Sequence, residues 1–114
     1  MRLPLAALAL ASVITSASAH DSWISRGALR NGAGEWCCGE GDCGLVDRGA
    51  VKTTFAGYRI DGFVTIGDGP GAIRTEIHEL VPFSEAQPSP DGEYWRCKRP
   101  DGTRRCFFAP PPAY

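Results

Sequence analysis

The sequence lacks a surplus of either charge. Its 114 residues hold 12 Lys and Arg against 13 Asp and Glu, a formal net charge of −1. A balance this even gives no general attraction to nucleic acid or to acidic lipid, so we expect no nucleic-acid partner. The chain also lacks an apolar run long enough to cross a bilayer as a helix. We therefore expect no membrane span in the mature chain.

Catalytic patterns are missing as well. The sequence contains no Ser, His and Asp arrangement typical of hydrolases, no glycine-rich nucleotide loop and no Cys-x-x-Cys pair. The acidic residues Glu40, Asp42 and Asp47 match no EF-hand spacing and are interpreted as a solvated loop. The sequence therefore predicts a protein that is not an enzyme.

The first feature that is present is a leader. Residues 1–19 combine a positive charge at Arg2, an apolar stretch, and small residues at Ala17 and Ala19. These are the three regions of a secretory signal peptide. We expect cleavage before His20 and a mature protein that is exported, either periplasmic or secreted.

The mature chain, residues 20–114, has the length of one small domain, and its strand and turn signals predict a mainly β fold. Four Asp-Gly pairs, at 61–62, 68–69, 91–92 and 101–102, are typical of tight turns between strands. The expected segments are a short helix within Asp21–Asn31, a Gly/Cys loop (31–44), strands at Val51–Ile60, Phe63–Ile66 and Ile73–Val81, an extended connection (Pro82–Pro90), a hairpin (94–108) and a Pro-rich tail (109–114). We expect a small antiparallel sheet of hairpins with an irregular, disulfide-tied N-terminal segment.

The C-terminal hairpin has the best-defined register. With its turn centred on Asp101-Gly102, the facing pairs are Cys97 with Cys106 and Trp95 with Phe108. One face is then apolar, and Lys98 and Arg105 share the other. A one-residue slip would move every side chain to the opposite face, so this amphipathic outcome favours the register.

Five cysteines are the other prominent feature, and all are disulfide candidates: Cys37, Cys38, Cys43, Cys97 and Cys106. Disulfides persist in the oxidising compartments that an exported protein reaches. The sequence leaves two arrangements open: a tie from the Gly/Cys loop to the hairpin, or a Cys97–Cys106 bond that closes the hairpin itself. One cysteine remains over, and its thiol makes a thiol redox protein an alternative function.

The two histidines, His20 and His78, suggest a second alternative. Cleavage before His20 would leave its amine and ring nitrogen free to bind copper(II), with His78 as a third nitrogen ligand. This pattern is similar to the N-terminal copper site of exported copper-carrier β-domains and of copper oxygenases that begin with histidine. A periplasmic copper-binding protein is therefore an alternative function, and copper is the one cofactor that the sequence suggests.

The charges are unevenly distributed. Residues 20–93 carry 6 basic and 12 acidic side chains, whereas residues 94–114 carry 5 and 1. The basic residues of the hairpin are Arg96, Lys98, Arg99, Arg104 and Arg105. Such a patch docks an anionic partner or complements the acidic body of its own domain, and the sequence leaves both open.

Four motifs complete the pattern: His20-Asp21-x-Trp23, Cys37-Cys38-Gly39-x-x-Asp42-Cys43, Ser89-Pro90-Asp91-Gly92-x-Tyr94-Trp95 and Arg105-Cys106-Phe107-Phe108-x-Pro110-Pro111. Together they resemble those of a family of small exported proteobacterial proteins, over most of the mature chain. The resemblance implies export and transfers no catalytic residue. We expect an exported, non-enzymatic, disulfide-stabilised binding or interaction domain.

Overall fold

The computed structural model describes residues 23–37 and 42–111. The predicted signal peptide, His20, Cys38 and the end of the Pro-rich tail lie outside these residues. The elements are α1 (Trp23–Arg26), β1 (Cys43–Val46), η2 (Arg48–Ala50), β2 (Val51–Thr54), β3 (Gly57–Ile66), η3 (Gly69–Gly71), β4 (Ile73–Val81), η4 (Phe83–Glu85), β5 (Ala86–Pro88), β6 (Tyr94–Lys98) and β7 (Arg104–Ala109), where η marks a 3₁₀ turn. None of the helices in the described part is long and apolar enough to cross a membrane.

The seven strands form one sheet, which confirms the mainly β prediction. The strand order is β2-β3-β1-β6-β7-β5, and β4 pairs with β3 outside this path. Five of the six strand pairings are antiparallel, as expected, but β5 runs parallel to β7. The parallel pair arises because the connection expected at Pro82–Pro90 turns at η4 and returns as β5 along the edge of β7.

The turn expected at Asp61-Gly62 is wrong. The chain reverses earlier, at Phe55-Ala56, and Asp61-Gly62 lies inside the ten-residue strand β3. A Cβ atom at position 62 would lie 2.5 Å from the Cβ of Ala50. The glycine is therefore needed for close approach of the η2 turn to the strand rather than for a hairpin turn.

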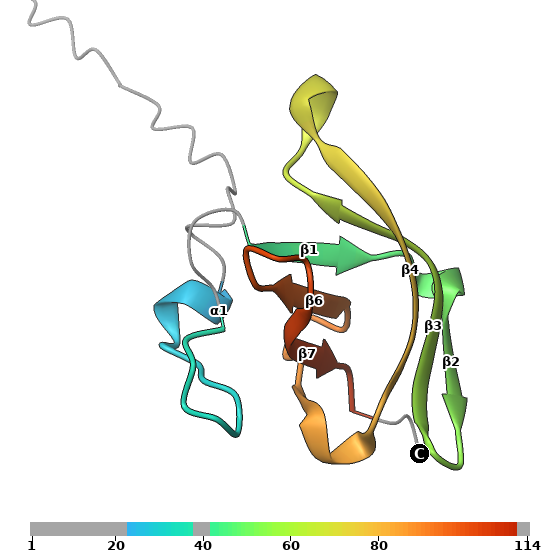
Figure 1. Ribbon diagram of the computed structural model, residues 1–114. Coiled ribbons are helices and arrows are strands. Elements are labelled where there is room, and N and C mark those ends of the chain that lie inside the picture. The colour runs from blue at the N-terminus through green and yellow to red at the C-terminus, as the bar shows by residue number, and fades with distance from the viewer. Residues whose placement is uncertain (1–22, 38–41, 112–114) are drawn as a thin grey trace, which may run out of the picture.

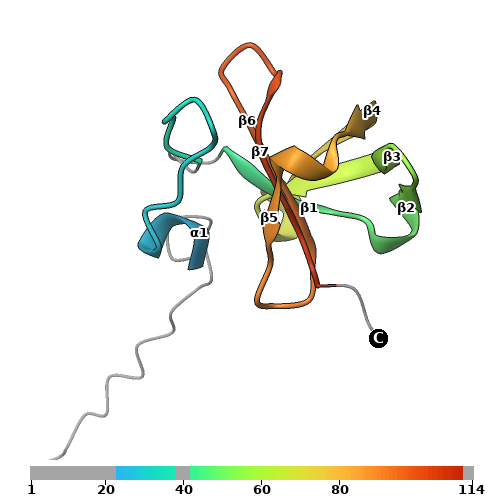
Figure 2. The ribbon, with the colours of Figure 1, turned by 90° about the horizontal axis from the view of Figure 1, so that it is seen from below.

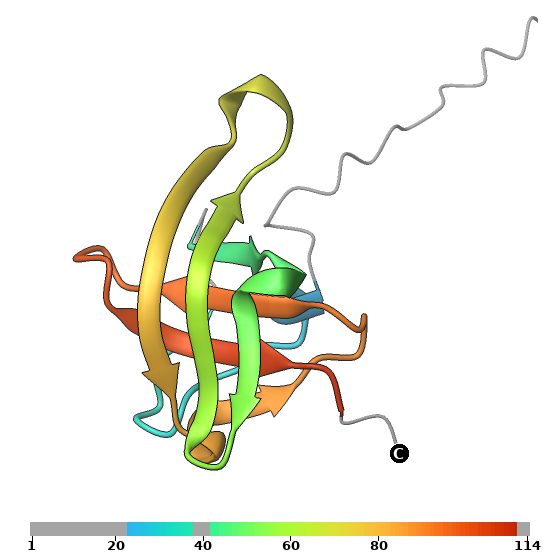
Figure 3. The ribbon, with the colours of Figure 1, turned by 90° about the vertical axis from the view of Figure 1, so that its right-hand side faces the viewer.

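The sheet folds into two layers. Figure 3 shows β2, β3 and β4 crossing in front of β6 and β7 at a steep angle. The core between the layers consists of Val46, Ala50, Ile60, Val64, Val81, Phe107 and Ala109. Burying this apolar surface drives the two layers together.

A third layer, the N-terminal segment (Trp23–Cys37), covers the opposite face of the β6–β7 hairpin (Figure 1). A second core lies between this segment and the hairpin. It consists of Ile24, Cys37, Cys43, Cys97, Cys106 and Phe108, with Trp23, Leu29 and Trp95 packed against it. Both faces of the hairpin are thus buried, since the face that carries Arg96 and Phe107 is covered by β3 and β4.

Two disulfides tie the loop to the hairpin: Cys37–Cys106 and Cys43–Cys97. Of the two open arrangements, the tie across the chain is confirmed and the Cys97–Cys106 bond is wrong. The facing register itself is confirmed, since Cys97 lies opposite Cys106 and Trp95 opposite Phe108. Each of the two facing cysteines bonds to a different loop cysteine.

The placement of Lys98 and Arg105 on one face is wrong. The register shifts between Cys97 and Lys98, so Lys98 lies opposite Arg104. Arg104 then reaches Glu79 of β4, whereas Arg105 reaches the N-terminal segment at Trp36. An extra residue in one strand re-aims the side chains beyond it, which is the usual effect of a β-bulge.

Candidate functional site

A hollow of about 560 Å³ lies between the N-terminal segment, η4 and the β6–β7 hairpin. Arginines from separate parts of the chain line it: Arg30, Arg99, Arg104 and Arg105. We call this the arginine hollow. Its size lies within the range of small-molecule binding sites. Three of the four arginines belong to the basic hairpin expected from the sequence, and Arg30 comes from the opposite wall.

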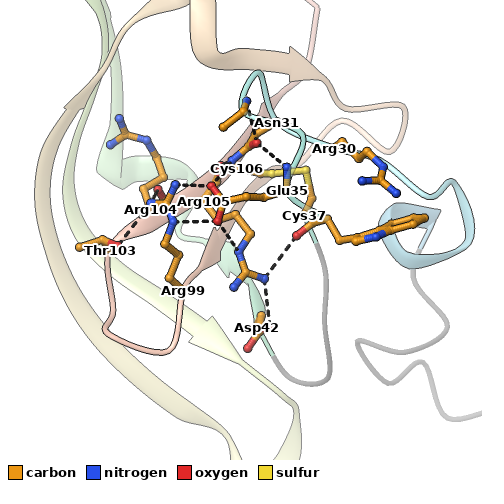
Figure 4. Close-up of polar contacts among 12 residues, drawn as sticks. Arg30, Asn31, Glu35, Cys37, Asp42, Arg99, Thr103, Arg104, Arg105 and Cys106 are labelled. Atoms are coloured by element: carbon orange, nitrogen blue, oxygen red, sulfur yellow. Dashed lines mark hydrogen bonds and ion pairs between the residues drawn. A yellow bond between two sulfur atoms is a disulfide. The ribbon is translucent and has the colours of Figure 1, made fainter.

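Glu35 lies at the centre of the charged contacts (Figure 4). Its Oε1 is 2.6 Å from Nη2 of Arg99, its Oε2 accepts from Nε of Arg99 at 3.0 Å, and Asn31 donates to Oε1 at 3.0 Å. The hydrogen bonds from Arg99, and then that from Asn31, lower the pKa of Glu35 to about 2. Glu35 is therefore ionised throughout the neutral range and fixes the guanidinium of Arg99.

Asn31 shapes the wall of the hollow. Its Oδ1 accepts from the backbone N–H of Ala33 and of Glu35, and its Nδ2 also donates to the carbonyl of Arg105. The first two bonds fold the loop locally, as Asn side chains do in turns. The third joins that loop to β7, so the same residue that forms the turn also sets the distance between the two walls.

Arg105 is the most enclosed of the hollow's arginines that face the N-terminal segment. Its Nη1 donates to the carbonyl of Trp36 at 3.3 Å and lies 3.5 Å from Oδ2 of Asp42. Its buried Nε has no hydrogen-bond partner among residues 23–37 and 42–111 and lies 3.8 Å from Oε2 of Glu35. A buried N–H without a hydrogen-bond acceptor is costly, and the nearby charge of Glu35 offsets part of that cost.

Arg30 differs from the other three. Its guanidinium stacks 3.9 Å from the centre of the Trp36 ring and donates to the carbonyl of Gly34, on the exposed surface. Arg99, Arg104 and Arg105 each contact a carboxylate. Within residues 23–37 and 42–111, Arg30 has no such partner, so its charge remains available to a ligand.

On the inner side of the hairpin, Glu79 joins two arginines. It accepts from Arg96 at 2.9 Å and from Arg104 at 2.6 Å, and Arg104 also contacts Glu85 at 2.7 Å. Burial raises the pKa of Glu79, but the hydrogen bonds from Arg96 and Arg104 outweigh it and hold the pKa below its usual value. Much of the basic hairpin therefore complements its own acidic body, one of the two outcomes that the sequence left open.

The remaining predicted site residues do not meet. His78 lies on the outer face of β4, with Nδ1 2.9 Å from Asp61 and Nε2 3.4 Å from Glu76. His20, its proposed copper partner, lies outside the described residues. The described part of the chain holds no group of three or more metal-binding side chains. Four cysteines are engaged in disulfides, and the fifth, Cys38, also lies outside.

The motifs of the sequence converge on the disulfide-bonded face of the hairpin. Oδ2 of Asp91 accepts from the indole N–H of Trp23 at 3.0 Å and from that of Trp95 at 2.9 Å. Trp23 packs edge-on against Phe108 at 5.0 Å between ring centres. These contacts join three of the four motifs, so their residues are explained by packing and hydrogen bonding.

Sequence reasoning missed Arg30, Asn31 and Glu35. The one available signal was Asn31-Gly32, a turn-forming pair, but nothing in the sequence places that turn beside Arg105. Comparison of the chain with protein-family models, with curated proteins and with solved structures gives no match. The site is therefore interpreted from its own chemistry.

Proposed function

We propose that the protein is an exported, non-enzymatic binding domain whose ligand carries an oxyanion, a carboxylate or a phosphate, held in the arginine hollow. One observation carries the proposal: four arginines and a single carboxylate residue, Glu85, are among the residues that line one hollow of ligand size. Guanidinium groups present paired N–H donors that match the geometry of carboxylate and phosphate oxygens. The two disulfides support export, because such bonds persist in oxidising compartments.

The carboxylates already present define the role of each arginine. Glu35, Asp42, Glu79 and Glu85 hold Arg99, Arg104 and Arg105 in place. Fixed guanidinium groups lose little conformational entropy when a ligand arrives, which favours binding. Arg30, which has no carboxylate partner in the described part of the chain, supplies the net attraction.

Titration of the mature protein with phosphate and with citrate, followed by NMR, tests the proposal. We expect the amide signals of Asn31, Gly32 and Ala33 to shift together and to saturate. Substitution Arg30→Ala should weaken binding by about tenfold, the loss of one charge-assisted contact of roughly 1.4 kcal/mol. Arg59→Ala is the matched control, because Arg59 is an exposed arginine paired with Asp61 on the far strand β3.

Two results would reject the proposal. One is the absence of saturable shifts around the arginine hollow with either anion. The other is an equal loss of affinity in Arg30→Ala and Arg59→Ala, because an equal loss would indicate general charge attraction instead of a defined site.

A further inference from the structure

A second hollow, of about 420 Å³, lies beside the first. It is mainly apolar, and Ser89 is the one hydroxyl residue among the lining residues Trp23, Gly27, Leu29, Pro88, Ser89, Pro90 and Pro111. We call it the apolar hollow. None of the described residues in its lining is charged, in contrast to the arginine hollow.

Along both walls, the residues that line the two hollows are neighbours in the chain. In the N-terminal segment, the apolar hollow ends at Leu29 and the arginine hollow begins at Arg30. On the opposite wall, the arginine hollow ends at Gln87 and the apolar hollow begins at Pro88. Gln87 crosses between the walls, donating from Nε2 to the carbonyl of Arg30 at 3.0 Å. The two hollows therefore adjoin at this hydrogen bond, one on each side of it, and together we call them the groove. The backbones of its two walls, the N-terminal segment and β5, face each other in Figure 2.

The β5 wall is the edge of the sheet. β5 pairs with β7 on one side and is the last strand in the sheet order. A third, mainly apolar hollow of about 280 Å³ is also lined by β5; it shares Gln87 with the arginine hollow, and Pro88 and Pro111 with the apolar hollow. Apolar lining residues thus lie along β5 next to the arginine hollow.

We propose that this groove binds an extended peptide in which an acidic residue adjoins apolar residues. The carboxylate would lie among Arg30, Arg99 and Arg105, and the apolar side chains would pack against Trp23, Leu29 and the prolines. The inference rests on the proposed oxyanion site and adds the chemical class of the ligand. It follows from the placement of the charged and the apolar halves end to end.

The shape of the apolar half favours a peptide over a fatty acid. The hollow is open to solvent, and its lining includes Trp23, Leu29 and three prolines. Extended peptides bind in open grooves lined by aromatic residues. An acyl chain requires an enclosed cavity that removes most of its surface from water.

Binding of four probes to the mature protein tests the inference by calorimetry. The probes are acetyl-Glu-Gly-Leu-Leu-amide, the reversed acetyl-Leu-Leu-Gly-Glu-amide, the truncated acetyl-Glu-Gly-amide, and octanoate. We expect one of the two long peptides to bind at least about tenfold more tightly than the truncated peptide and octanoate, because partial burial of two leucine side chains contributes that much.

Matched variants assign this gain to the apolar hollow. Pro111→Glu introduces a charge at an exposed position that lines the hollow, and it should remove the difference between long and truncated peptides. Pro70→Glu changes an exposed proline in the η3 turn between β3 and β4 and should leave the difference intact. Arg30→Ala should weaken the long and truncated peptides by the same factor.

The outcomes separate the two proposals. If acetyl-Glu-Gly-amide binds in an Arg30-dependent manner and both long peptides bind no more tightly, the oxyanion site stands and the peptide inference is overturned. If octanoate binds more tightly than either long peptide, the inference is overturned in favour of an acyl ligand. If no probe responds to Arg30→Ala, the oxyanion site fails, and with it the placement of the peptide.

Discussion

The two faces of the β6–β7 hairpin are held by different means. On the side of β3 and β4, a regular strand ladder and a core that includes Phe107 and Val64 cover the hairpin. On the other side, a segment with one short helix covers it, and two disulfides fix that segment. A sheet layer holds its position through repeated backbone hydrogen bonds, whereas an irregular segment requires covalent or side-chain ties.

The difference explains where the groove lies. Both its halves use the irregular segment as one wall and the sheet as the other. Binding residues commonly lie on surface loops that a rigid scaffold holds in position. The disulfides then keep the loop wall at a fixed distance from the scaffold.

Removal of one disulfide should have the largest effect. Because Cys43–Cys97 remains in Cys37→Ala/Cys106→Ala, the loop that is no longer closed is about 15 residues long, and we expect the free energy of unfolding to fall by ~3 kcal/mol. Denaturant unfolding measures this loss, and hydrogen exchange should show it first in residues 29–37. Cys38→Ala, which leaves both disulfides in place, is the control. Uniform loss of protection in β3 and β4 would contradict the separation of the two faces.

The central ion pair on the sheet side should have the next largest effect. Glu79→Gln removes the charge that compensates Arg96, whose side chain is 6% exposed. We expect a loss of ~2–3 kcal/mol, less than for a fully buried pair because Glu79 is partly exposed. Glu76→Gln, on the same strand but solvent-facing, should change stability by less than ~0.5 kcal/mol. Equal effects of the two changes in chemical denaturation would refute the role of Glu79.

On the disulfide side, Asp91→Asn should cost less. Asp91 accepts from Trp23, Trp95, Ser89 and the backbone N–H of Glu93. An amide replaces one acceptor with a donor that faces other donors, and we expect a loss of ~1–2 kcal/mol. Tryptophan fluorescence should shift as the indole rings lose their partner. Asp68→Asn, in the exposed β3–β4 turn, should leave both stability and fluorescence unchanged.

The sequence predicted the sheet-side elements better than the loop side. The alternation in Ile73–Val81 predicts β4 with its full length, because side-chain period reflects which face is buried. The facing of Cys97 and Cys106 follows from the same reasoning. The turn at Phe55-Ala56 could not be found this way, since it lacks turn-forming residues and a strong Asp-Gly signal stood six residues later.

The groove could not be predicted because its residues meet only through tertiary contacts. Arg99 and Glu35 are 64 residues apart, and Asn31 and Arg105 are 74 apart. Local periodicity carries no information on such pairs. The charge excess of the hairpin pointed to the correct strands, but the partner carboxylates depend on the register shift between Cys97 and Lys98, opposite Arg105.

Two titrations with opposite signs extend the comparison to pH. On the loop side, the pKa of Glu35 is lowered to about 2 from 4.5, so its stabilising contribution is present above pH 4.5 and is lost as pH falls toward 2. On the sheet side, hydrogen bonds to Asp61 and then to Glu76 raise the pKa of His78. Its contribution is therefore present below pH 6.5, the ordinary value, and is lost as pH rises through the raised pKa.

Asp61→Asn should give the smallest of the expected effects. The charged groups that contact His78 are Asp61 across the β3–β4 ladder and Glu76 on its own strand. Loss of the Asp61 charge should lower the pKa of His78 toward its ordinary value, as an NMR titration of the imidazole protons would show. Because these groups are exposed, stability should hardly change. Glu35, on the opposite face of the hairpin, should keep its low pKa in this variant. A shift at Glu35 would indicate that the two faces are electrostatically coupled, contrary to the separation inferred from their packing.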